Sequence, residues 1–223
     1  MSDIWQFFID GTYLYATLET LLMTLLAMIF GYVIGLPVGV ALTVTGKGGI
    51  SENQVIYKIL DFIVNVMRSI PFLILMILVI PVTRFIVGKS YGTMATVVPL
   101  VIAAAPFIAR MVESSLKEVD AGVIEAAESL GASKFTIIFK VLIAEARTSL
   151  IVGMTIAFGT ILGYSAMSGA LGGGGLGKVA ITYGYNRFRT DIMVPAVIII
   201  VLLVQLFQWL GMKLSRSLDR RIR

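Results

Sequence analysis

Three charged side chains lie within apolar stretches of the sequence, where a charge is costly unless it has a function or a partner. Glu19 is the only charged residue between Thr12 and Thr45, and Asp61 and Arg68 fall in the next apolar stretch. An ion-coupled carrier needs a buried carboxylate, so Glu19 and Asp61 are the candidates for such chemistry, near the predicted ends of their spans. If the second helix begins near Lys58, Arg68 lies about 15 Å along its axis, near mid-bilayer; if the helix begins later, Arg68 lies at the interface.

The segment Gly172 to Val179, GGGGLGKV, matches two nucleotide-binding patterns by its spacing. It fits G-x-x-x-x-G-K, but Val179 stands where a phosphate-binding loop needs Ser or Thr to hold magnesium. Gly172, Gly174 and Gly177 also satisfy G-x-G-x-x-G, but no hydrophobic strand of a βαβ unit precedes them. We interpret the segment as a flexible turn where a helix ends or re-enters, and we expect the chain itself to bind no ATP, no other cofactor and no metal.

The composition excludes most other chemistry and indicates a membrane protein. The 223 residues include no cysteine and no histidine, which excludes thiol nucleophiles, disulfides, histidine metal sites and Ser-His triads. Hydrophobic residues make up 58% and charged residues 14%, whereas soluble domains carry roughly 25% charged residues. The apolar residues come in unbroken blocks, which is typical of transmembrane helices. A net charge of +5 would suggest nucleic acid in a soluble protein, but membrane topology explains it here, and no nucleic-acid partner is expected.

The apolar blocks predict an all-α integral membrane protein with a single transmembrane domain, residues 1–223, and five spans. The expected spans are 12–45, 59–82, 93–109, 149–171 and 192–212, with a short loop at 84–92. Pro71 and Pro81 predict kinks in the second span, and Pro99 and Pro106 should break the regularity of the third, because proline lacks a backbone donor.

The distribution of the basic residues predicts the orientation of these spans in the membrane. The first loop, the long loop between the third and fourth spans, and the C-terminal tail hold twelve of the 18 Lys and Arg residues, the opposite side holds five, and Arg68 is the remaining one. Basic residues concentrate in cytoplasmic loops. The N-terminus is therefore expected outside, with the long loop and the C-terminus in the cytoplasm.

Gly31, Gly35 and Gly39 recur at every fourth position of the first span. Residues at this spacing form one stripe along a helix, and a stripe of small residues lets two helix backbones approach closely. We favour simple packing for this stripe over a moving hinge.

The most polar long interval of the chain lies between the third and fourth spans, at about 110–147. Asp120 can cap a first helix with its carboxylate, and Gly131 can end that helix in the left-handed conformation. Ser133 can then cap a second helix that runs toward Ile143. The sequence thus predicts a short helix, a glycine turn and another helix on one side of the membrane.

This interval resembles the cytoplasmic EAA loop of ABC importer permeases. The family pattern is E-A-A, three residues, glycine, nine residues and then a hydrophobic residue near a proline. Glu125, Ala126, Ala127 and Gly131 match it, and Ile143 and Ala144 fall where the family has an apolar residue followed by proline. Ala144 departs from the pattern. The resemblance implies that the short helix docks into a groove on an ATP-hydrolysing subunit; the alternative is an ordinary amphipathic loop helix.

Further motifs extend the resemblance over about residues 12–212, to the permeases of methionine ABC importers. They are Arg68-Ser69-Ile70-Pro71-Phe72, Ala105-Pro106-Phe107-Ile108-Ala109-Arg110, Gly163-Tyr164-Ser165-Ala166-Met167 and Tyr183-Gly184-Tyr185. The first two are shared loosely with other amino-acid permeases, and the third is more specific to the methionine type. The resemblance implies that the translocation path or its gate includes Arg68, Ser69, Pro71, Tyr164, Ser165 and Met167, with packing as the alternative role of Met167.

The same resemblance implies a type I ABC importer permease fold in the bacterial plasma (inner) membrane. Two copies would pair as a homodimer around a central path, and each would dock one cytoplasmic ATPase subunit that carries ATP and Mg. An external binding protein, often a lipoprotein, would deliver methionine, with L-methionine as the main cargo and D-methionine as a further candidate. The permease itself would be no enzyme and would work by alternating access.

Two other transport functions stay open at this point. The chain could be an ABC permease for another small amino acid or a short peptide, because the binding protein does much of the selection. It could also be an ion-coupled secondary carrier, whose uptake would survive ATP depletion and collapse without the ion gradient. A non-transporting scaffold would give no reason for an EAA loop.

Overall fold

The first apolar stretch folds as one continuous helix of 34 residues, α2 (Thr12–Thr45), in the computed structural model, which describes residue 7 and residues 9–218. Its bounds are those expected from the sequence. The helix begins after Gly11, in the left-handed conformation, and ends at Gly46. Three basic residues of the tail, Arg220, Arg221 and Arg223, lie outside the described residues.

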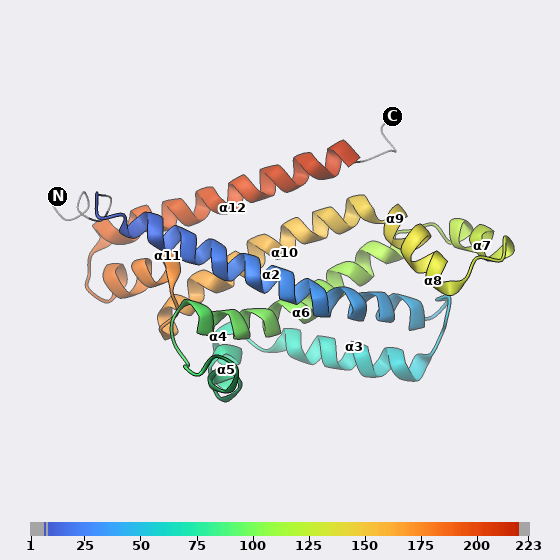
Figure 1. The fold of residues 1–223 in the computed structure, drawn as a ribbon, viewed down its shortest axis with the longest axis horizontal. Helices are drawn as coiled ribbons and strands as arrows, with labels where there is room; N and C mark the ends of the chain where they lie inside the picture. The colour runs from blue at the N-terminus through green and yellow to red at the C-terminus, as the bar shows by residue number, and fades with distance from the viewer. Residues whose placement is uncertain (1–6, 8, 219–223) are drawn as a thin grey trace.

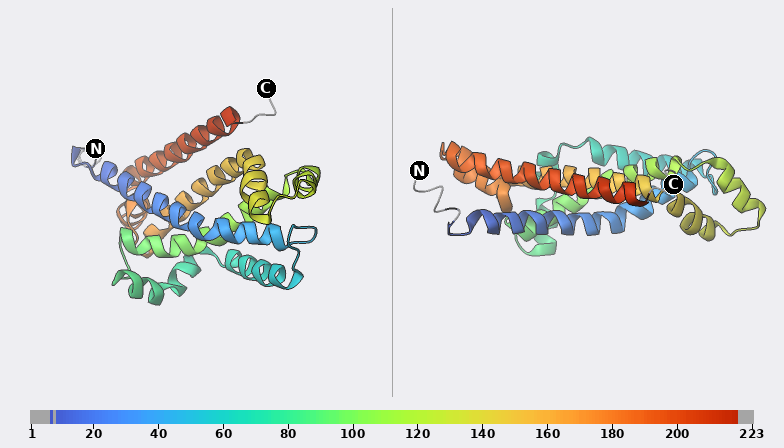
Figure 2. Two further views of the ribbon diagram at one scale, coloured as in Figure 1. Left: turned by 45° about the vertical axis from the view of Figure 1, so that its right-hand side comes forward. Right: turned by 90° about the horizontal axis from the view of Figure 1, so that it is seen from above.

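The described part of the chain is an elongated bundle of helices (Figure 1). Four helices are each long and apolar enough to cross a membrane: α2, α6 (Thr93–Lys117), α10 (Arg147–Ser168, extended by a 3₁₀ turn to Leu171) and α12 (Thr190–Leu218). The pair α3 (Gln54–Ser69) and α4 (Phe72–Leu78) passes the same test only when taken together. Figure 2 shows the long helices running side by side along the bundle.

The second expected span, 59–82, is interrupted near both of its prolines, as expected, but the bends are breaks between separate helices. Helix α3 ends at Ser69, α4 starts at Phe72, and their axes differ by 102°. Pro71 stands at the break, where it removes the amide that would have continued the helix. A second break follows, because α5 (Ile80–Val87) begins a new helix with Pro81 in its first turn. Residues 84–87, expected in a loop, therefore belong to α5.

The third expected span also differs, because α6 runs without interruption from Thr93 to Lys117. Pro99 and Pro106 lie inside it and are buried, so packing against neighbouring helices holds the backbone where the two prolines remove hydrogen bonds. The helix continues past Ala109, where the span was expected to end. Arg110 and Lys117 extend it because both are paired with acidic side chains.

Close packing between α2 and α6 forms the centre of the bundle, and it depends on the glycine stripe. A Cβ atom built on Gly35 would lie 2.6 Å from the carbonyl oxygen of Ala105, and one on Gly39 would lie 2.6 Å from that of Ala109. At Gly31 the nearest atom would be the Cβ of Ala104, at 2.9 Å. The two backbones are in direct contact, so the packing interpretation of the stripe is confirmed.

We expect Gly39→Val to lower the stability of the folded chain by about 1–3 kcal/mol, the usual cost of forcing extra atoms into a packed core. The measurement is the midpoint of thermal unfolding of the full-length chain in mild detergent. Gly159→Ala is the matched control, because a Cβ there would have its nearest neighbour at an ordinary 3.5 Å. An unchanged midpoint for Gly39→Val would show that α2 and α6 can separate freely.

The loops that the basic residues assign to one side do lie at one end of the bundle (Figure 1). The first loop contacts the long loop through Lys134 Nζ and Ser51 Oγ, 2.7 Å apart. The end of α12 lies beside the start of α10, where Arg147 donates to the carbonyl of Leu218 at 2.9 Å. At the opposite end, the Tyr13 hydroxyl donates to the carbonyl of Ile192 at 3.0 Å.

Candidate functional site

The first candidate site is the polar loop, which folds as its capping residues predict. Helix α7 (Ala121–Ser129) begins at Asp120, whose carboxylate accepts a hydrogen bond from the amide of Gly122 at 2.7 Å. Gly131 follows the helix with φ 74°, the left-handed conformation that glycine adopts without strain. Ser133 Oγ then accepts from the amide of Thr136 at 3.2 Å and caps α8 (Lys134–Thr136).

The α7 helix projects from the end of the bundle and has no buried residue. Glu125 and Ala126 are exposed and Ala127 is half-buried. Around them, Leu130 and Phe135 are 88% and 70% exposed. Exposed large apolar side chains gathered at one place mark a surface that contacts another molecule. The small alanines let such a partner come close to the α7 backbone.

The second half of the loop anchors α7 to the bundle. A π-helical stretch, Ile137–Leu142, continues α8 into α9 (Ile143–Glu145), and its two end residues are buried. Ile143 is half-buried and Ala144 is exposed. The helix is interrupted at Ala146, after the Ala144 position where the resembled family has proline.

The first loop supports α7 from the other side. A cavity of about 420 Å³ lies between the two loops and is lined by residues including Lys47, Lys117, Glu125 and Glu128. The first loop is held in shape by Glu52, whose carboxylate accepts from the amide of Gly48 at 3.0 Å. This hydrogen bond lowers the pKa of Glu52 below its ordinary value.

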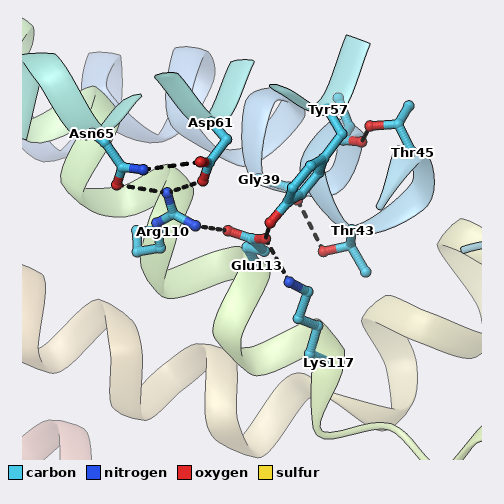
Figure 3. Close-up of polar contacts among 10 residues, drawn as sticks. Gly39, Thr43, Thr45, Tyr57, Asp61, Asn65, Arg110, Glu113 and Lys117 are labelled. Carbon is cyan, nitrogen blue, oxygen red and sulfur yellow. Dashed lines mark hydrogen bonds and ion pairs between the residues drawn. The ribbon is translucent and has the colours of Figure 1, made fainter. Parts of the chain in front are cut away.

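A cluster of paired charges joins α3 to α6 (Figure 3). This cluster was not predicted from the sequence. Arg110 donates to Asp61 at 2.6 Å, to Asn65 at 2.9 Å and to Glu113 at 2.6 Å. Lys117 donates to Glu113 at 2.7 Å. The signal was present in the spacing, because Arg110, Glu113 and Lys117 at i, i+3 and i+7 share one helix face.

Glu113 is the buried centre of this cluster, with only 1% of the residue exposed. Besides its two cationic partners it accepts from the Tyr57 hydroxyl at 3.4 Å. Donors of this kind replace the water that a buried carboxylate loses and so offset the cost of its burial. Asp61, a candidate coupling carboxylate from the sequence, is thus engaged in an ion pair with Arg110.

The second candidate site is a cavity of about 160 Å³ at the break between α3 and α4. Its lining includes Arg68, Phe72, Phe107 and Tyr164. The rings of Phe72 and Tyr164 stack in parallel with centroids 4.8 Å apart, and the Arg68 guanidinium lies 6.0 Å from the Phe107 centroid. Within the described residues, Arg68 forms no ion pair with a carboxylate. A cation without an anionic partner beside aromatic rings can receive a carboxylate with an apolar side chain.

The structure brings only some of the expected path residues to this cavity. Arg68 and Tyr164 line it, and Ser69 and Pro71 lie at the adjacent break, where Ser69 Oγ donates to the carbonyl of Asn65 at 2.8 Å. Helix α3 starts at Gln54, so Arg68 lies about 20 Å along its axis.

Ser165 and Met167 are not part of the cavity lining. Ser165 is 1% exposed, and its hydroxyl donates to the carbonyl of Leu162 at 2.7 Å within α10. Met167 points away from the packed interior and is 48% exposed. In the described chain, Ser165 therefore has an internal packing contact, whereas Met167 is available to a neighbouring molecule.

Within the described residues, no group of three or more acidic side chains is placed to hold a metal ion. The glycine-rich segment that resembles a phosphate loop lies against α2 and α6 and is preceded by helix α10 instead of a strand. A helix does end at this segment, as expected, because the 3₁₀ extension of α10 stops at Leu171. A new helix, α11 (Gly175–Lys178), and a π-helical stretch, Val179–Tyr185, follow the turn directly.

Comparison with known proteins gives a consistent result. A family model described as "Binding-protein-dependent transport system inner membrane component" matches residues 31–223. The probable D-methionine transport system permease protein MetI of Vibrio cholerae is 47% identical over 206 residues, 92% of each chain. The methionine import system permease protein MetP of Bacillus subtilis is 44% identical over 180 residues, 81% of each chain.

Solved structures share the fold. A chain from an inward-facing conformation of the MetNI methionine ABC transporter superposes with a TM-score of 0.93 at 46% identity, covering 95% of this chain and 98% of the other. An amino acid ABC transporter solved with histidines matches with a TM-score of 0.77 at 21% identity, covering 94% and 95%. At that identity the second match shows a common fold alone.

Proposed function

The chain belongs to the family of binding-protein-dependent transport system inner membrane components, and on this premise we propose that it is the membrane permease of an ATP-driven importer for methionine. The expected all-α ABC importer fold of type I is confirmed by its match to a chain of a methionine ABC transporter. The cargo follows from the relatives, which carry methionine or D-methionine transport in their names at 44–47% identity.

The observation that carries the proposal is the exposed α7 helix at the cytoplasmic end. Its surface offers Glu125, Ala126 and Ala127, and Gly131 turns the chain back toward the bundle. Ile143 and Ala144 complete the loop where it rejoins α10. We propose that each of two permease copies docks one ATPase subunit here, and that the ATPases hold the ATP and Mg. The glycine-rich segment supports this division, because it is packed between membrane helices at the opposite end.

The break between α3 and α4 is the proposed part of the translocation path. Arg68 would receive the carboxylate of the cargo, and the stacked rings of Phe72 and Tyr164 would contact its thioether chain. Ser69 and Pro71 shape the break, and Ser165 packs inside the bundle with its hydroxyl bonded within α10. The exposed Met167 would line the path from the other side or the dimer contact. An external binding protein would deliver the cargo, and ATP binding and hydrolysis would alternate access between the two sides.

The ion-coupled alternative has less support. It needs a carboxylate that is free to bind and release an ion, whereas Asp61 is 2.6 Å from Arg110 and Glu19 is held by neighbouring donors. An ABC permease for another small amino acid stays the second candidate, because Arg68 beside the cavity would suit the carboxylate of any amino acid.

Uptake of labelled L-methionine at low concentration tests the function. Cells that lack other methionine systems are compared with and without this chain, and with D-methionine, methionine dipeptides and unrelated amino acids as competitors. We expect saturable uptake that requires the chain, stops on ATP depletion and persists when the ion gradient is collapsed.

The outcomes separate the candidates. Uptake that survives ATP depletion would contradict the ABC mechanism. Unchanged methionine uptake without the chain would remove methionine as cargo, and the same cells would then be screened with other labelled amino acids. Competition by D-methionine but by no unrelated amino acid would establish the substrate range expected from the relatives' names.

A further inference from the structure

The carboxylate of Glu19 joins three separate segments at the end of the bundle opposite α7. Its Oε1 accepts a hydrogen bond from Thr93 Oγ1, at the start of α6, at 2.6 Å. Its Oε2 accepts from the amide of Gly175, at the start of α11, at 2.8 Å. The next residue of α2 adds a third contact, because Thr20 Oγ1 accepts from the amide of Leu176 at 2.9 Å. Two adjacent α2 side chains therefore hold the glycine-rich segment by its backbone.

The glycines are required by the closeness of this contact. A Cβ atom on Gly174 would collide with the Thr93 hydroxyl, and one on Gly177 would collide with the carbonyl of Ala166 in α10. Gly175 has φ 74°, and a Cβ there would meet the Thr20 hydroxyl. The run GGGGLG is therefore a strip of backbone pressed between three helices, which accounts for the glycines without any phosphate.

The strip adjoins an apolar cluster, to which its Leu176 belongs. Beyond Gly175 the chain continues into α11 and the π-helical stretch, which pack on α2 and α12. The cluster consists of Tyr13, Ala16, Leu176, Val179, Ala180, Ile192 and Ala196, each 9% exposed or less. A third hydrogen bond fixes the strip at its other end, where the amide of Gly92 donates to the carbonyl of Gly172 at 2.8 Å.

We propose that Glu19, with Thr20 and Thr93, is a clamp that holds the glycine-rich strip closed at the outer end of the permease, and that releasing the clamp opens this end. The assignment of this end to the outside rests on the proposed function. Glu19 is a positioning residue, because it contacts the backbone of the strip and not the cargo. Its charge makes each hydrogen bond stronger than one between neutral groups.

The clamp has a consequence for the importer cycle. The solved relative that superposes at a TM-score of 0.93 is inward-facing, and an importer in that state is closed at its outer end. Bonds that exist only in the closed arrangement stabilise it relative to the open one. Weakening the clamp is therefore expected to increase the fraction of permeases in the outward-open conformation. It should also raise the rate of ATP hydrolysis in the absence of the binding protein.

Cysteine labelling tests the clamp directly, because the chain has no cysteine of its own. Ala180→Cys places one thiol in the apolar cluster next to the strip, at a residue 9% exposed. It is labelled with a maleimide in membranes opened so that the reagent reaches both faces. We expect the labelling rate to rise about tenfold when Glu19→Gln or Thr93→Val is added, the effect of losing one charge-assisted hydrogen bond. Thr93→Ser, which keeps the hydroxyl, should label at the original slow rate.

Thr17→Val is the matched control for Thr93→Val. The Thr17 hydroxyl donates to the carbonyl of Tyr13 within α2, at 2.7 Å, and this bond joins no second segment. Tyr91→Cys, at a residue 69% exposed, shows the rate for an open site at the same end. Equal labelling of Ala180→Cys with and without Glu19→Gln and Thr93→Val would overturn the clamp, as would equal acceleration by Thr17→Val.

The cycle readout separates this proposal from the proposed function. Glu19→Gln should increase ATP hydrolysed per cargo imported by the complex with its ATPase. If the unaltered chain imports nothing while labelling still depends on Glu19, the proposed function fails and the clamp stands. If the unaltered chain imports cargo with ATP and the ratio is unchanged in Glu19→Gln, the clamp has no part in the cycle.

Discussion

Cells that carry Glu125→Lys are expected to lose at least about 90% of cargo uptake while the permease remains folded in the membrane. Glu125 is exposed on a helix without buried residues, so the change costs little in the isolated chain. At a docked interface, a reversed charge leaves an unpaired group and typically costs about 2–5 kcal/mol. The measurement combines uptake with co-purification of the ATPase subunit on tagged permease.

Three further variants test the same interpretation. Glu145→Lys makes the same charge change at an exposed residue where the loop rejoins the bundle, and it should transport normally. Gly131→Trp should uncouple transport like Glu125→Lys, because a bulky residue is strained at φ 74° and adds volume beside α7. Gly131→Asn should be tolerated, since asparagine enters the left-handed region more easily than other side chains. Normal uptake by Glu125→Lys or Gly131→Trp would contradict docking through α7.

The second large effect is expected from Arg110→Met, which should destabilise the chain by about 3–5 kcal/mol, the usual cost of removing one partner of a buried ion pair. Glu113 is 1% exposed and would keep only Lys117 and Tyr57 as partners. Asp61 would also lose its ion pair with α6, which would weaken the attachment of α3. The measurement is denaturant-induced unfolding of the full-length chain in mixed detergent micelles.

A paired variant distinguishes charge burial from simple loss of packing. Arg110→Met with Glu113→Gln removes both the cation and the buried anion, and it should recover more than half of the lost stability. Asp61→Asn should cost less than Arg110→Met, because the Asp61 side chain is 31% exposed and water can solvate what remains. If the double variant is less stable than Arg110→Met alone, the buried charge is not the source of the effect.

Local patterns in the sequence determined the class of protein and the shape of its polar loop. Unbroken apolar blocks require helices in a bilayer, because only internal hydrogen bonds can satisfy the backbone there. Asp120, Gly131 and Ser133 act within a few residues of themselves, so their caps and turn could be predicted without a tertiary structure, and the structure confirms all three. The EAA resemblance belongs to the same local level.

Only the tertiary structure decided where charges and prolines are tolerated. At Pro71 the helix ends and the axes of α3 and α4 differ by 102°. Pro99 and Pro106, in contrast, lie within a continuous α6. The difference depends on neighbours: α6 is packed among other helices, which hold its backbone in place. Proline chemistry is the same at all three positions, so the sequence alone could not separate them.

The pairing of charges is decided in the same way. Arg110 extends α6 beyond its expected end because Asp61, 49 positions earlier in the chain, lies against it. Glu19 finds its partners at Thr93 and Gly175, 74 and 156 positions away. A charge within a span is visible in the sequence. Its partner is fixed only when the helices pack, because packing brings together residues that are far apart in the sequence.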